Sequence, residues 1–156
     1  MSRQEREALI ADLTAQMKEL SKITPFIAID EEGGSVTRIA HAPSKGFKVP
    51  RYKSMEAIGR TGDSSKALEA GRTIGAYLKD YGFNLDFAPV ADVNTNPKNR
   101  VIGSRAFGSD PELVAQMVTA FIDGLHESGV LATVKHFPGH GDTSADTHWG
   151  TVAVKK

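Results

Sequence analysis

Residues 64–90, SSKALEAGRTIGAYLKDYGFNLDFAPV, contain a helical pattern that runs directly into a strand pattern. Apolar and small residues recur at helical spacing as far as Tyr81, and Gly82 is typical of a helix end. The apolar run 83–90 is expected to be a strand, with Pro89 near its end. The helix is expected to approach a sheet closely through an inward stripe of small and apolar residues: Ala67, Ala70, Gly71, Ile74, Gly75 and Leu78.

The same succession of helix and strand occurs on both sides of this unit. Upstream, residues 3–20 have the spacing of an amphipathic helix, and the apolar run 25–30 predicts a strand buried on both faces. Downstream, Asp110 and Pro111 are an N-cap and a first-turn proline, and residues 130–134 are expected to form a third strand. The first helix has the apolar face Leu9, Leu13, Met17 and Leu20. The last has the apolar face Val114, Met117, Val118, Phe121 and Leu125.

Alternating helices and strands predict an α/β protein with a parallel sheet and right-handed crossovers. The connections that follow the strands are long and polar, because residues 31–62 and 91–110 have no sustained periodicity. The helix-to-strand connections are short by comparison. Long loops after parallel strands place functional residues at the carboxyl ends of the strands, so we expect the site there.

The composition excludes several classes of protein. The chain has 156 residues, a length that suits one domain, and no cysteine, which excludes disulfide frameworks and thiolate sites. Its 19 basic residues balance 19 acidic ones, which argues against a nucleic-acid partner. No stretch is apolar enough for a membrane span. The charged N-terminal segment lacks the features of a secretory signal, and we therefore expect a cytoplasmic location.

Three of the five histidines lie between Lys135 and His148, in an irregular segment rich in glycine and proline. One interpretation pairs Asp146 with His148, because a nearby carboxylate that accepts the ring N–H fixes the tautomer and prepares the imidazole for acid and base catalysis. A second interpretation is a zinc site formed by His136, His140, Asp142 and His148. A third is a surface loop with incidental histidines. The segment also contains a candidate cis bond, Phe137–Pro138.

Other polar residues follow the remaining strands. The turn Asp30–Gly34 presents a carboxylate to a ligand, or it is an ordinary βα turn with solvated acids. Single cations, each alone typical of a solvated or paired surface residue, lie on three different loops: Arg38, Arg105 and Lys135.

Three further residues allow more than one interpretation. Asp92 and Asn94 are candidates for ligand binding or for turn capping, and Trp149 for a sugar site, a loop cover or the core. The G-x-G-x-x-G, P-loop and G-x-S-x-G motifs are absent, so the common dinucleotide, phosphate and serine-hydrolase patterns are not found.

Four segments taken together resemble glycoside hydrolase family 3, and specifically its β-N-acetylglucosaminidase branch. They are Ile29–Gly34 followed by Arg38, Phe87–Val93, Ile102–Phe107 and Lys135–His148. The last is the most specific, because Lys-His-Phe-Pro-Gly-His-Gly followed by Asp-x-His separates this branch from the β-glucosidases. The resemblance covers almost the whole chain.

The resemblance implies a (β/α)8 TIM barrel and a retaining enzyme that removes terminal N-acetylglucosamine from β-linked saccharides without a metal or other cofactor. Cell-wall fragments are the expected substrates, as in peptidoglycan recycling, and neither nucleic acid nor membrane is implied. His148 matches the residue that protonates the leaving oxygen and later activates water, and Asp146 matches the residue that holds its imidazole. Five positions match residues that hydrogen-bond the sugar: Asp30, Arg38, Arg105, Lys135 and His136.

The chain departs from the family pattern at both ends. The family's nucleophile is an Asp in a Ser-Asp-Asp-type motif beyond Lys156, and its first barrel strand precedes the first helix of this chain. Three strands are expected here, whereas a full barrel has eight and typically about 250 residues. We therefore expect one partial N-terminal barrel domain over residues 1–156, with about three βα units, no second domain and no turnover by the isolated chain.

Two other functions compete with this interpretation. One is a non-catalytic sugar-binding or assembly fragment of the same fold, and the other is a metal-dependent hydrolase that uses the histidine cluster. A partial barrel also has open sheet edges and uncovered apolar faces. These predict self-association, a complementing barrel fragment or poor solubility.

Overall fold

The computed structural model describes residues 1–41 and 47–153. In chain order, the described elements are helix α1 (Arg3–Glu19), strand β1 (Ala28–Ile29), helices α2 (Met55–Gly59) and α3 (Ser64–Asp80), strand β2 (Leu85–Asp86), helix α4 (Pro111–Glu127) and strand β3 (Leu131–Ala132). Short 3-10 turns lie at Gly103–Arg105 and Thr147–Trp149. The predicted alternation of helix and strand is confirmed.

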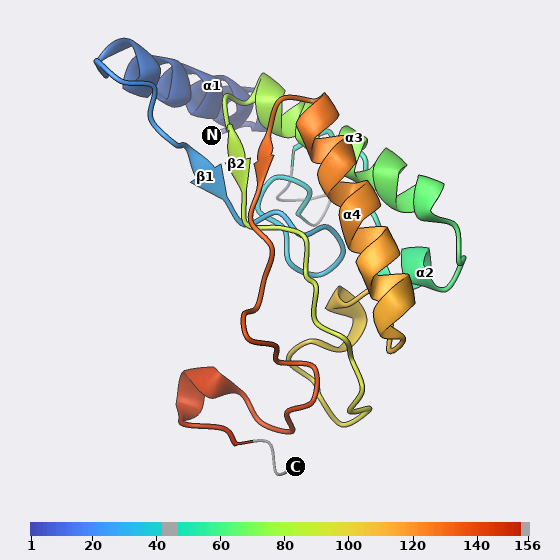
Figure 1. The fold of residues 1–156 in the computed structure, drawn as a ribbon. Helices are drawn as coiled ribbons and strands as arrows, with labels where there is room; N and C mark the ends of the chain where they lie inside the picture. Colours follow the sequence, from blue (N-terminus) through green and yellow to red (C-terminus); the bar gives the residue numbers. More distant parts are fainter. Residues whose placement is uncertain (42–46, 154–156) are drawn as a thin grey trace.

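The three strands form one parallel sheet in the order β1-β2-β3 (Figure 1). Ala28 lies opposite Leu85, which lies opposite Leu131. Each strand has only two residues in the ladder, although a further parallel bridge joins Val90 to Lys135. The parallel sheet is therefore as predicted, but its strands are shorter than the apolar runs indicate.

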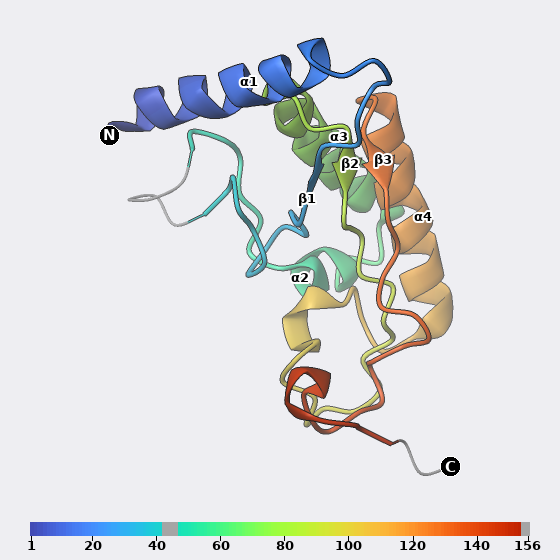
Figure 2. The ribbon, with the colours of Figure 1, turned by 90° about the vertical axis from the view of Figure 1, so that its left-hand side faces the viewer.

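Helices α3 and α4 lie side by side on one face of the sheet (Figures 1 and 2). The predicted inward stripe of α3 is buried, but its two glycines, Gly71 and Gly75, face α4 and the residue after it. A Cβ on Gly71 would overlap the carbonyl of Phe121, and one on Gly124 would overlap the backbone of Leu68 and Arg72. At these glycines the close approach is to a helix and not to the sheet as expected, because a small residue fits a helical neighbour equally well.

The ends of these helices are set by local hydrogen bonds. The Asp110 side chain accepts a hydrogen bond from the Leu113 amide at 2.8 Å, and Pro111 begins α4 as predicted. Ser54 caps α2 in the same way, by accepting from the Ala57 amide at 3.0 Å. Helix α2 lies within the stretch predicted to be irregular, and its five residues are too few for a periodic pattern.

Helix α1 has the predicted extent but not the predicted packing. Its apolar stripe is half exposed, with exposed fractions of 44% for Leu9 and 49% for Met17. The buried residue of this helix is Thr14, whose hydroxyl donates to the carbonyl of Tyr81 at 2.9 Å. Strand β1 likewise is not buried on both faces, since Phe26 just before it is 72% exposed. Both differences leave apolar side chains exposed, on α1 and just before β1.

The long connections gather at the end of the sheet where the strands finish, opposite α1 (Figure 2). They include residues 30–41, 87–110 and 133–153 of the described chain. Among the described helices, none is both long enough and apolar enough to cross a bilayer. The fold therefore places the polar loops together at the carboxyl ends of the strands, as the loop lengths predict.

Candidate functional site

The centre of the site is an ion-pair network among the loops that follow β1, β2 and β3. Glu32, whose side chain is 1% exposed, accepts from Arg105 Nε at 2.8 Å and Nη2 at 2.7 Å. Lys135 Nζ lies 2.5 Å from the same carboxylate and 2.6 Å from Asp30 Oδ1. The hydrogen bond to Glu32 raises the pKa of the Arg105 guanidinium above its ordinary value. Glu32 thus gathers two predicted sugar-binding cations at one point.

A second buried carboxylate, Glu31, shapes the loop that carries Arg38. It accepts hydrogen bonds from the backbone amides of Arg38 at 2.5 Å, Ile39 at 2.9 Å and Ala40 at 2.9 Å. The Tyr77 hydroxyl also donates to it at 2.9 Å. The Arg38 side chain is left largely exposed, with Nη2 3.5 Å from Asp30 Oδ2.

Asp86 of β2 lies buried beneath these loops. One of its oxygens accepts from the Glu31 amide at 3.0 Å, and the other has no hydrogen-bond partner among the described residues. Burial raises the pKa of the Asp86 carboxyl well above its ordinary value, because the charged form loses its hydration. Asp86 is therefore harder to ionise than an ordinary aspartate, and it lies under the charged part of the site.

The His136 ring lies between the Asp92 carboxylate and the Arg105 guanidinium. Its Nδ1 is 2.6 Å from Asp92 Oδ2, and its Nε2 is 3.2 Å from Arg105 Nη2. Burial alone would raise the pKa of the Asp92 carboxyl, but hydrogen bonds from His136 and from the His140 amide outweigh it and hold the pKa below its ordinary value. Asp92 therefore stays ionised at neutral pH.

Asp146 and His148 lie in contact further along the same loop. Asp146 Oδ1 accepts from the His148 amide at 2.9 Å and lies 2.5 Å from the His148 ring Nδ1. These two bonds lower the pKa of the Asp146 carboxyl. The pair sits at a 3-10 turn, Thr147–Trp149, although the sequence predicts an irregular loop. The turn places the Asp146 carboxylate in contact with the His148 ring, two residues further along the chain.

One cavity of about 640 Å³ joins these groups. Its lining includes all the predicted site residues except Asp146: Asp30, Arg38, Arg105, Lys135, His136 and His148. Asp146 lies behind His148, in contact with its ring. The lining thus combines charged hydrogen-bond donors and acceptors with the His148 imidazole, which Asp146 supports. Such a lining suits a polyhydroxylated ligand.

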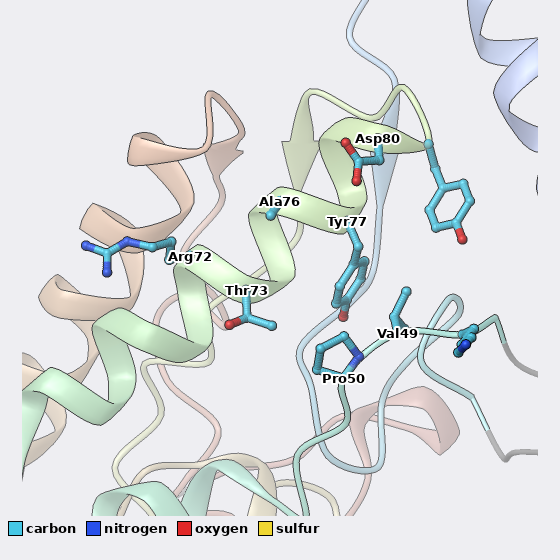
Figure 3. Close-up of a pocket in the computed structure, with 9 residues that line it drawn as sticks. Val49, Pro50, Arg72, Thr73, Ala76, Tyr77 and Asp80 are labelled. Carbon is cyan, nitrogen blue, oxygen red and sulfur yellow. The ribbon is translucent and has the colours of Figure 1, made fainter.

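A separate pocket of about 560 Å³ lies on the outer face of α3 (Figure 3). Val49 and Pro50 face Tyr77 across it, and Arg72 and Asp80 belong to its rim. It contains none of the predicted site residues, and its central hydroxyl already donates to Glu31. The chemistry of the chain therefore lies at the strand ends and not at this pocket.

The structure does not assemble the predicted zinc ligands. Within residues 1–41 and 47–153, no three His, Asp or Glu side chains are grouped as a metal site. Asp142 instead accepts from the Thr95 hydroxyl, and His140 Nδ1 lies 2.9 Å from the Thr143 hydroxyl. The described residues therefore give the zinc interpretation no ligand set.

Several residues of the site differ from their sequence-based interpretation. Glu31 and Glu32 are fully buried, so the interpretation of solvated acids in the turn is wrong. Trp149 is 90% exposed and does not pack in the core. Asp92 holds ring and backbone groups of the loop after β3 and does not cap its own turn. The Phe137–Pro138 bond is cis, as expected.

A parallel α/β sheet with charged residues at the carboxyl ends of its strands and a carboxylate–histidine pair beside a polar cavity is the arrangement of a barrel-type hydrolase. The chain belongs to glycosyl hydrolase family 3, because the model of the "Glycosyl hydrolase family 3 N terminal domain" matches residues 1–156. The three parallel strands and the helices between them are accordingly part of a TIM-barrel-like domain, as the sequence predicts.

Relatives and solved structures agree with this assignment. Beta-hexosaminidase A of Pseudoalteromonas piscicida is 40% identical over 145 residues, which cover 90% of this chain and 23% of that protein. The family 3 β-N-acetylglucosaminidase of Paenibacillus sp. str. FPU-7 is similar with a TM-score of 0.84 and 42% identity, over 91% of this chain and 27% of that one. NagZ from Neisseria gonorrhoeae, solved with N-trifluoroacetyl-D-glucosamine, has a TM-score of 0.82 and 33% identity. The match covers 94% of this chain and 43% of NagZ.

The chain therefore spans less than half the length of each of these proteins. By resemblance its class is that of the glycoside hydrolases, and the relatives are named for hexosaminidase or N-acetylglucosaminidase activity.

Proposed function

We propose that residues 1–156 carry the acid/base pair and part of the sugar site of a retaining β-N-acetylglucosaminidase. The observation that carries the proposal is the single cavity whose lining joins Asp30, Arg38, Arg105, Lys135 and His136 to His148. The names of the relatives support N-acetylglucosamine as the sugar. The substrate class we propose is a β-linked saccharide that ends in N-acetylglucosamine, such as a cell-wall fragment.

The proposed chemistry uses the two nitrogens of His148 for different tasks. Ionised Asp146 accepts a hydrogen bond from Nδ1–H of the His148 imidazolium, and the proton that is transferred lies on Nε2. Nε2–H donates to the glycosidic oxygen as the bond from that oxygen to the sugar breaks, and a carboxylate outside residues 1–156 forms a new bond to the sugar carbon. The neutral imidazole then takes a proton from water as the water oxygen displaces that carboxylate.

The charged residues of the network would hold the sugar while this happens. Lys135 has three N–H donors and uses two of them on Asp30 and Glu32. Arg38 is exposed at the cavity and contributes further donors. Hydrogen bonds from charged donors are the stronger ones, so these cations suit the hydroxyls and acetamide of N-acetylglucosamine.

Calorimetric titration of the chain with N-acetylglucosamine tests the binding part of the proposal. We expect weak, millimolar binding that is reduced in Arg38→Met and retained in Arg60→Met, a matched exposed arginine paired with Glu56. Absence of binding by the unaltered chain at millimolar sugar would reject the proposal.

Turnover of an aryl N-acetylglucosaminide tests the catalytic part. Because the proposed nucleophile lies outside residues 1–156, we expect no turnover by this chain alone, with or without added zinc. Metal-independent turnover would require another nucleophile in the chain, and zinc-dependent turnover would favour the metal-dependent alternative. Sugar binding that persists without hydrolysis in the complete protein would favour the non-catalytic alternative.

The edges of the sheet suggest a protein partner. Strands β1 and β3 are the outer strands of the described sheet, and apolar side chains beside them are exposed, including Phe26 at 72% and Val134 at 50%. Open edges with exposed apolar side chains favour association. We propose that this surface pairs with further barrel segments or with a second copy of the chain.

A further inference from the structure

Asp92 follows β2 and joins two parts of the loop that follows β3. Its side chain is fully buried. Oδ2 lies 2.6 Å from His136 Nδ1, and Oδ1 accepts from the His140 amide at 2.5 Å. One carboxylate therefore contacts a predicted sugar-binding ring and the backbone of the segment leading to Asp146 and His148.

The contacts of His136 determine which ring nitrogen carries the proton. Nε2 lies 3.2 Å from Arg105 Nη2, and a guanidinium has donors but no acceptor. Nε2 must therefore be the acceptor in that contact. The proton of the neutral ring then lies on Nδ1, where the Asp92 carboxylate accepts it. His136 is thus held with Nε2 as an acceptor at the cavity that it lines.

The other contact of Asp92 belongs to a wider attachment between the two loops. The Asn99 side chain donates to the carbonyl of His140 at 2.7 Å, and the Asn96 side chain donates to the carbonyl of Thr143 at 3.0 Å. Gly141 packs so closely that a Cβ there would overlap the carbonyl of Val93. The segment that leads to the acid/base pair is therefore supported from the loop after β2.

We propose that Asp92 is a positioning residue that keeps His136 in the Nδ1–H tautomer and anchors the segment leading to Asp146 and His148. The role of the site in sugar binding rests on the function proposed above, whereas the tautomer does not. Because Nε2 has one lone pair and accepts from Arg105, a ligand hydroxyl that donates to His136 must take the place of that contact. Asp92 then acts on the ligand only through His136 and through the placement of the loop.

The tautomer can be measured directly by ¹⁵N NMR of the histidine-labelled chain at neutral pH, with His136 assigned by loss of its signals in His136→Gln. We expect the protonated-nitrogen signal on Nδ1 and the unprotonated one on Nε2. In Asp92→Asn, one side-chain oxygen cannot accept from both the ring and the His140 amide, so we expect a shift toward Nε2–H and a changed His140 amide signal. Asp123→Asn, an exposed carboxylate on α4, is the matched control and should change neither.

The outcomes separate this inference from the proposed function. A proton on Nε2 in the unaltered chain, or an unchanged tautomer in folded Asp92→Asn, would overturn it. If Asp92→Asn does not fold, the spectrum of the unaltered chain alone decides. The Nδ1–H tautomer in a chain that does not bind N-acetylglucosamine would leave Asp92 as a positioning residue and reject the sugar site. Binding of N-acetylglucosamine by a chain whose His136 carries its proton on Nε2 would support the sugar site and reject Asp92 as the residue that sets the tautomer.

Discussion

Replacing Glu32 by Gln removes the charge at the centre of the ion-pair network while keeping the shape of the side chain. Glu32 is 1% exposed and contacts Arg105 and Lys135, each 16% exposed, at distances between 2.5 and 2.8 Å. Without the carboxylate, two mostly buried cations lose their shared counter-charge. Removing one partner of a buried ion pair costs about 3 kcal/mol or more.

Urea unfolding measures this cost. With a urea dependence of about 2 kcal/mol per molar for a domain of this size, a loss of about 3 kcal/mol lowers the midpoint by about 1.5 M. Glu127→Gln is the matched control, because Glu127 pairs with Arg72 at 2.5 Å but both side chains are about half exposed. Exposed pairs contribute about 0.5 kcal/mol, so this midpoint should fall by about 0.25 M. Equal shifts in the two variants would refute the reasoning.

Three further predictions concern the fold. Asp86 has a pKa raised by burial, so its contribution to stability is greatest below its ordinary pKa of 3.8 and declines as pH rises. Thermal melts from pH 4 to 7 should show this decline in the unaltered chain and its loss in Asp86→Asn. If the melting temperatures of the two proteins change with pH in parallel, the assigned role of Asp86 is contradicted. Gly124→Ala should destabilise the chain by about 2 kcal/mol in urea, since the new methyl meets the α3 backbone. Gly108→Ala should change little, since its methyl would make only an ordinary contact with the Leu113 side chain at 3.5 Å. Light scattering should show association that Val134→Lys reduces; a monodisperse monomer would contradict the proposed edge contacts.

The three long helices, α1, α3 and α4, and the order of the strands between them were predictable because their signals are local. The N-cap Asp110 and the proline after it define the start of α4, and the buried stripe of α3 follows the helical period. The lengths of the strands were not predictable. The apolar run 25–30 does not reveal that β1 is an edge strand, since this depends on which segments pair with it.

The gathering of the predicted residues at one cavity was predictable, whereas the contacts between them were not. Residues at the ends of parallel strands meet at one edge, and the family resemblance predicts which of them contact sugar. The burial of Glu32 could not be predicted, because its partner Arg105 lies 73 residues further along the chain. For the same reason Asp92 was ambiguous, since its acceptor role depends on His136, 44 residues away. The only local signal for Glu32 was its place beside Asp30 in an acidic turn.

The central claim is that His148, supported by Asp146, transfers the proton in glycoside cleavage. The most direct measurement compares His148→Ala with the unaltered complete enzyme on N-acetylglucosaminides whose leaving groups differ in acidity. A leaving group that needs protonation should lose about 10² to 10⁴ in rate, the usual contribution of a general acid, whereas the most acidic leaving group should lose much less in its cleavage step. An equal loss for all leaving groups, or none, would contradict the assigned role.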